Sequence, residues 1–110
     1  MSILTKAKDW MLQEAAKIWI NNEYRRFGTM TKLEIDSQKR TIHVELDLKG
    51  ETAPIKVDVG RYTLVEENGK TYLEMAEVST SREWINLLLE EFVKQPRFAV
   101  PQGRIVKALL

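Results

Sequence analysis

The chain has 110 residues, of which 44% are hydrophobic and 30% charged, a composition typical of one ordinary globular domain. It contains no cysteine, which excludes thiol catalysis, cysteine-ligated zinc, iron–sulfur clusters and disulfide bonds. Seventeen basic and sixteen acidic residues leave a net charge of +1, so the overall charge does not favour a nucleic acid or an anionic membrane as partner. Charged residues interrupt the N-terminal region, and no run reaches the roughly 20 apolar residues of a membrane span. We therefore expect a single soluble, cytoplasmic domain over residues 1–110 with no membrane span.

The first predicted element is a long helix over residues 3–27, which we expect to end at Gly28 because glycine suits the position after a helix. Spacing of 100° per residue predicts that its buried stripe is formed by Leu4, Ala7, Met11, Ala15 and Ile18. Trp10 and Trp19 lie on opposite margins of that stripe, about 180° apart around the axis. One sheet cannot easily bury both tryptophans, so the sequence predicts more apolar surface on this helix than its own domain covers.

Alternating apolar and polar residues predict four strands, at about 30–36, 40–49, 55–65 and 70–78. The second strand has the clearest alternation, with a dry face formed by Ile42, Val44, Leu46 and Leu48. The alternation changes phase at Gly60, which predicts a bulge or a bend there. Asn68 and Gly69 predict a tight hairpin between the third and fourth strands. Strands with one dry and one wet face, with no helix between them, predict an antiparallel meander.

A second helix is predicted over residues 81–94, with Thr80 as N-cap and Glu83 completing a capping box. Its predicted buried side consists of Trp84, Ile85, Leu88, Leu89, Phe92 and Val93. The remaining residues, 97–110, are predicted as a tail with an extended start and a short C-terminal helix. Together these elements predict an α+β fold of order α-β-β-β-β-α, a two-layer sandwich in which both helices cover the dry face of the four-stranded sheet.

Candidate catalytic and metal-binding residues are few. His43, the one histidine, shares the wet face of its strand with Glu45 and Asp47, at a spacing of about 6.6–7 Å per two residues. That spacing is too wide for a shared metal ion without help from adjacent strands, so we interpret these side chains as a solvated face paired with charges on neighbouring strands. The serines fall in predicted caps and turns, and the glycines are scattered, so neither a nucleophile motif nor a phosphate loop is present. We expect no catalytic residues, no metal, no cofactor and no enzymatic activity.

The surplus of apolar surface favours a non-enzymatic binding or interaction module. One version binds an apolar or lipid-like ligand between the helices and the sheet, at a site lined by Trp10, Ile42, Val44, Val57, Met75, Trp84 and Leu88. A second version binds a protein partner or a second copy of the chain through Trp19, Leu109 and Leu110. A third alternative is weak binding of nucleic acid through Arg25, Arg26 and the basic tail, which the interleaved acidic residues and the near-zero net charge disfavour.

Overall fold

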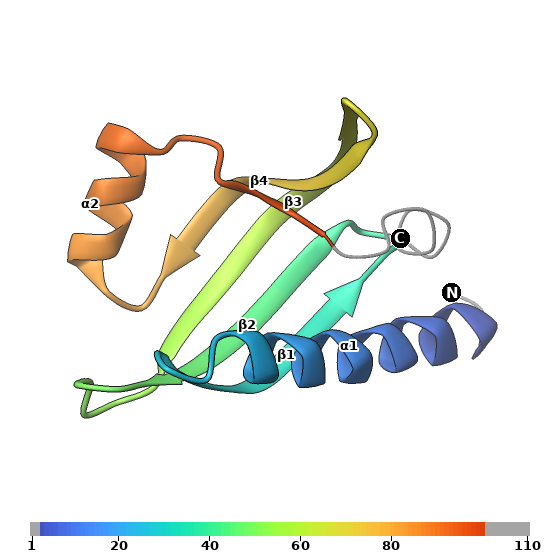
Figure 1. Ribbon diagram of the computed structural model, residues 1–110. Helices are drawn as coiled ribbons and strands as arrows, with labels where there is room; N and C mark the ends of the chain where they lie inside the picture. Colours follow the sequence, from blue (N-terminus) through green and yellow to red (C-terminus); the bar gives the residue numbers. More distant parts are fainter. Residues whose placement is uncertain (1–2, 101–110) are drawn as a thin grey trace.

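The computed structural model describes residues 3–100, without the side chains of residues 3–5 and 98. The elements in chain order are α1 (Ile3–Glu23), β1 (Gly28–Asp36), β2 (Thr41–Leu48), β3 (Ile55–Glu67), β4 (Lys70–Thr80), α2 (Glu83–Phe92) and β5 (Arg97–Ala99). The predicted α+β class and the order α-β-β-β-β-α are confirmed (Figure 1). The predicted C-terminal helix, with Leu109 and Leu110, lies outside the described residues. No helix in the described part of the chain is long and apolar enough to cross a membrane.

The strands form one antiparallel sheet of order β1-β2-β3-β4-β5. Its register places Val44 between Leu33 of β1 and Val57 of β3, as expected for a shared dry face. The predicted hairpin is confirmed, since Asn68 and Gly69 both have positive φ, 52° and 77°, as the tight turn between β3 and β4 requires. Strand β5 was not predicted; it extends the sheet by pairing with residues 72–74 of β4.

The alternation of inward and outward side chains changes phase at Gly60 in β3 and at Glu77, opposite it in β4. Val59 pairs with Val78 and Arg61 with Ala76, so no residue is inserted, and Glu77 opposite Gly60 has a φ of 56°. The next buried residue after Val59 is Tyr62, three positions later. A Cβ on Gly60 would lie 2.8 Å from the Cβ of Glu77, so glycine makes this close approach possible. The structure therefore resolves the two predicted alternatives in favour of a bend.

The core lies on the dry face of the sheet and is joined by one side of α1. Its buried members are Met30, Leu33, Ile42, Val59, Tyr62 and Leu73. Ala16 and Ile20 of α1 pack against this cluster, whereas Met11 and Ile18 are 66% and 69% exposed. The prediction that the stripe centred on Met11 and Ile18 is buried was therefore wrong, because α1 packs through its opposite side.

Hydrogen bonds to the edge strand explain the orientation of α1. The side chain of Asn21 accepts the N–H of Met30 at 2.6 Å and donates to its carbonyl at 3.0 Å. Gln13 Oε1 accepts the N–H of Ile35 at 2.7 Å. Asp9, which is 5% exposed, accepts from both the backbone N–H and the hydroxyl of Ser37, at 3.0 and 2.7 Å. These bonds satisfy donors that an edge strand would otherwise leave open. They turn the polar side of α1 inward and its most apolar stripe outward.

Two boundaries also differ from the prediction. Helix α1 ends at Glu23 instead of residue 27, and residues 24–27 form a turn closed by a bond from the N–H of Phe27 to the carbonyl of Tyr24 at 3.0 Å. Helix α2 has Arg82 as its N-cap and no side-chain capping bond, so the predicted capping box is absent. Thr80 remains in β4, where its hydroxyl accepts the Arg82 N–H at 3.1 Å and donates to the Arg82 carbonyl at 2.9 Å.

Helix α2 packs beside the end of β4, away from α1 (Figure 1). The prediction that α2 buries one side against the sheet was wrong, because no residue of this helix is buried. Ile85 and Leu89 are half-buried, while Trp84, Leu88 and Phe92 are exposed. The main apolar surface of α2 is therefore not part of the folded core.

Candidate functional site

The exposed side of α2 carries several large apolar residues close together. Its exposed apolar residues, with their exposed fractions, are Trp84 58%, Leu87 57%, Leu88 46%, Phe92 76% and Val93 47%. Apolar side chains gathered in this way on one helix mark a binding surface more often than isolated exposed residues do. We call the four that lie within the helix, Trp84, Leu87, Leu88 and Phe92, the α2 apolar face; Val93 caps its C-terminal end.

Polar contacts hold α2 in place without using that face. Asn86 Oδ1 accepts the N–H of Thr80 at 2.7 Å, and Asn86 Nδ2 donates to the carbonyl of Thr80 at 3.0 Å. At the start of the helix, Arg82 Nε donates to Glu51 Oε1 at 3.3 Å, and its Nη2 donates to the carbonyl of Ala53 at 3.2 Å. These bonds position the helix from its polar side, so the α2 apolar face needs no intramolecular partner.

A second feature lies where α1 meets β1 and β2. It is a hollow of about 230 Å³, lined mainly by Ile20, Tyr24, Phe27, Met30, Leu46 and Leu48. The rings of Trp19 and Tyr24 are in edge contact at 6.3 Å, and those of Tyr24 and Phe27 lie 6.5 Å apart. Phe27 is 61% exposed, with the guanidinium of Arg26 5.8 Å from its ring centroid. The hollow is thus apolar inside and bordered by basic residues.

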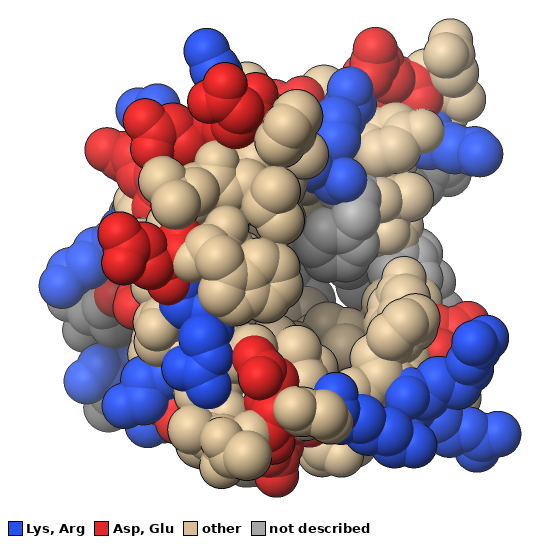
Figure 2. Space-filling view, turned by 90° about the vertical axis from the view of Figure 1, so that its left-hand side faces the viewer, with Lys and Arg blue, Asp and Glu red and all other residues tan. Residues whose placement is uncertain are grey.

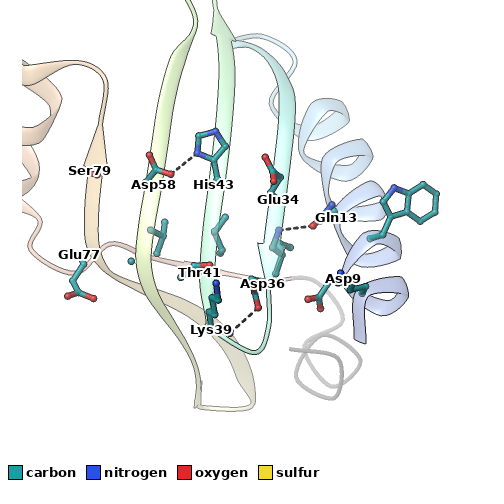
Figure 3. Close-up of a pocket in the computed structure, with 16 residues that line it drawn as sticks. Asp9, Gln13, Glu34, Asp36, Lys39, Thr41, His43, Asp58, Glu77 and Ser79 are labelled. Atoms are coloured by element: carbon teal, nitrogen blue, oxygen red, sulfur yellow. Dashed lines mark hydrogen bonds and ion pairs between the residues drawn. The ribbon is translucent and has the colours of Figure 1, made fainter. Parts of the chain in front are cut away.

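A larger groove of about 710 Å³ separates the N-terminal half of α1 from the strands (Figure 3). Carboxylates from four elements line it, namely Asp9 of α1, Glu34 and Asp36 of β1, Asp58 of β3 and Glu77 of β4. Lys6, Lys39 and Trp10 also contribute to its walls. The groove is open and polar, in contrast to the apolar, enclosed pockets that bind most small molecules.

His43 lies in this groove as one member of a ladder of charges. Its Nδ1 is 2.6 Å from Asp58 Oδ1 and its Nε2 is 2.8 Å from Glu45 Oε2. The bonds to Glu45 and Asp58 raise the pKa of His43 above its ordinary value, and the bond to His43 lowers the pKa of Glu45. Lys32 continues the ladder, 3.2 Å from Glu34 and 4.0 Å from Glu45. This arrangement is an ion-pair network across the wet face, with His43 held between two carboxylates.

Within residues 3–100, no cluster of three histidine, cysteine, aspartate or glutamate side chains is arranged to hold a metal ion. Both ring nitrogens of His43 are bonded to carboxylates, and no hydroxyl nucleophile is bonded to it among the described contacts. Nothing in the described residues indicates an enzymatic activity. Tyr62 is a separate feature: its side chain is fully buried, its hydroxyl has no hydrogen-bond partner, and burial raises its pKa to about 12.

The residues predicted to line a ligand site do not converge on one cavity. Trp10 and Ile42 line the polar groove, and Val44 and Met75 pack against the core. Val57 is half-buried in β3. Trp84 and Leu88 belong to the α2 apolar face. These seven residues are therefore distributed over three regions of the molecule.

Of the predicted interaction residues, Trp19 is half-buried beside Tyr24, and Leu109 and Leu110 lie outside the described residues. Arg25 and Arg26 are exposed next to the hollow. The hollow itself was not predicted from the sequence. A usable signal was the pair of aromatic residues, Tyr24 and Phe27, that follows a long helix and precedes a glycine.

No protein-family model, no curated protein and no solved structure matches this chain.

Proposed function

We propose that the protein is a non-enzymatic interaction module that binds a protein partner through the α2 apolar face. The observation that carries the proposal is the exposure of that face, from 46% at Leu88 to 76% at Phe92, on a helix that is positioned by polar contacts and by its opposite, half-buried side. Folding leaves these side chains in contact with water. Burying them against a partner removes their apolar surface from water, which is favourable. The cytoplasmic location expected from the sequence stays part of this proposal.

The alternatives receive less support from the geometry. Pockets for drug-sized or lipid-like ligands usually measure about 300–1,000 Å³ and are largely apolar. The apolar hollow is smaller, at about 230 Å³, and the larger groove is lined by carboxylates. Nucleic-acid binding would need a basic surface, and the α2 apolar face is flanked instead by Glu83, Glu90 and Glu91. A protein surface with an apolar centre and a basic rim is the partner that this face fits best.

The test compares two double substitutions on the same helix. Leu88→Ser with Phe92→Ser changes the exposed side of α2, and we expect the midpoint of thermal unfolding to move by less than about 3 °C, as for other surface changes. The matched control, Ile85→Ser with Leu89→Ser, changes the half-buried side of the same helix and should lower the midpoint clearly. Both variants are compared with the wild type at a protein concentration at which sedimentation shows the chain to be monomeric, and binding of an apolar fluorescent dye should then fall in the first variant.

An equal loss of stability in both variants would contradict the proposal, because it would mean that the chain itself covers the α2 apolar face. Unchanged dye binding in the Leu88→Ser, Phe92→Ser variant would contradict it as well.

A further inference from the structure

We infer that the partner is a second copy of this chain, and that Phe92 of each copy inserts into the apolar hollow at the end of α1 in the other. The inference deepens the proposed function and rests on it, since it names the occupant of the α2 apolar face. Three observations support it: the size of the hollow, the charges around both surfaces, and their placement on one side of the molecule.

The hollow has the volume of one large side chain. An apolar cavity of about 150 Å³ is enough to bind benzene, and the hollow measures about 230 Å³. Its walls are apolar and include the rings of Tyr24 and Phe27, which favour edge contacts with a further ring. Phe92 is the most exposed large apolar residue described, at 76%, and projects from the last turn of α2. A projecting phenyl ring and a phenyl-sized hollow are the complementary parts of an interface hot spot.

The balance of charge around the two surfaces is opposite: Lys94 follows the acidic pair of α2 and Glu23 precedes the basic pair after α1, but each is outnumbered. Glu90 and Glu91 are exposed beside Phe92, in the last turn of α2. Arg25 and Arg26 are exposed beside the hollow, and Lys49 joins them because its backbone N–H bonds the carbonyl of Phe27 at 2.9 Å. Pairing α2 with α2 of another copy would oppose acidic residues, whereas pairing α2 with the end of α1 opposes acidic and basic residues. Charge therefore selects the second arrangement.

Both surfaces lie on the side of the molecule that carries α2, which Figure 2 shows facing the viewer. Acidic side chains gather towards the upper left of this side, and a group of basic side chains lies towards its lower right, although further basic side chains lie along its left edge (Figure 2). A two-fold axis lying in such a face places the acidic part of each copy on the basic part of the other. The same contact then forms twice, which gives a closed dimer instead of an open chain of copies.

The test measures self-association of the full chain by sedimentation. The wild-type protein should form a dimer at micromolar concentration. Arg25→Glu with Arg26→Glu should weaken dimerisation about tenfold or more, and Glu90→Arg with Glu91→Arg should weaken it similarly, since each creates a like-charge contact. The second pair lies in the last helical turn, where basic residues are favoured, so α2 should stay folded. Arg61→Glu with Lys70→Glu, both exposed on β3 and β4, is the matched charge control and should dimerise like the wild type.

Mixing the two reversed variants is the decisive step. One variant is basic on both surfaces and the other acidic on both, so the mixture should form heterodimers with an affinity near that of the wild type. Phe92→Ala should weaken the dimer with its charges unchanged, and Leu48→Trp, which fills the hollow, should do the same.

A monomeric wild-type protein, or a mixture that does not associate, would overturn the inference. If Leu88→Ser with Phe92→Ser still leaves stability unchanged and lowers dye binding, the proposed function survives and the partner is a different protein. If the Leu88→Ser, Phe92→Ser variant unfolds, both the proposed function and the dimer inference are wrong.

Discussion

Helix α1 packs along β1 and helix α2 packs beside β4, and each is held by an asparagine whose side chain bonds both the N–H and the carbonyl of one strand residue. Asn21 bonds Met30 in this way and Asn86 bonds Thr80. Helix α1 also packs Ala16 and Ile20 against the core, whereas α2 contributes no buried residue. Because the Asn86 side chain helps to hold α2, this helix stays in place with only Ile85 and Leu89 half-buried and its other apolar residues exposed.

The largest expected effect separates the two sides of α1 itself. Ile20→Ser should lower the free energy of unfolding by about 2–4 kcal/mol, because it removes an apolar side chain packed on the core and places a hydroxyl there. Ile18→Ser, two residues away on the 69% exposed side, should change it by no more than about 0.5 kcal/mol. Denaturant unfolding measures both. The reverse order would mean that α1 packs through the stripe first predicted from the sequence.

The sequence did not show which side of α1 packs because the inward side carries polar Asp9 and Gln13 as well as apolar Ala16 and Ile20. Hydrophobic periodicity alone therefore favours the more apolar stripe of Met11 and Ile18, which is exposed. The choice depends on Asp9, Gln13 and Asn21 meeting donors and acceptors of β1 and its following turn. Those are contacts between residues 9 to 28 positions apart, which no local pattern contains.

The strands were predictable because the sequence features that specify them lie within a few neighbouring residues. Alternation in β2 and the Asn68-Gly69 turn each specify a structure within a few residues. The capping box at Thr80 failed for the opposite reason, since pairing with Val57 keeps Thr80 in β4. At the candidate site, the sequence identified Trp84 and Leu88 as apolar helix residues, but whether a sheet covers them depends on where α2 lies.

A smaller effect on stability should distinguish the bonds made by Asn21 from those made by Asn86. Asn21→Leu leaves the N–H and carbonyl of buried Met30 without their partner, which should cost about 1–3 kcal/mol of global stability. Asn86→Leu removes the equivalent bonds to Thr80, but half-buried Ile85 and Leu89 still hold α2 in place. We expect faster hydrogen exchange at residues 83–92 and a smaller drop in the global unfolding midpoint than Asn21→Leu causes. An equal or larger loss of global stability from Asn86→Leu would contradict this difference.

The smallest expected effect concerns His43, whose ion pairs lie in the polar groove. Because its folded-state pKa is raised above 6.5, its pairing stabilises the fold below that value and is lost as the pH rises through the raised pKa. The pKa of Glu45 is lowered from 4.5, so its contribution is present above that value and is lost as the pH falls through the lowered pKa. The stabilisation is therefore greatest between about pH 4.5 and 6.5.

His43→Gln should thus lower the unfolding midpoint most near pH 5.5 and progressively less towards pH 8, by a few degrees at most because these pairs are partly exposed. Asp47→Asn is the matched control, because Asp47 is exposed on the same strand face and makes no bond to His43 among the described contacts. Thermal unfolding at half-unit pH steps gives both profiles. A His43→Gln deficit that grows with pH would reverse the sign of the linkage and show that the imidazole is neutral between its two carboxylates.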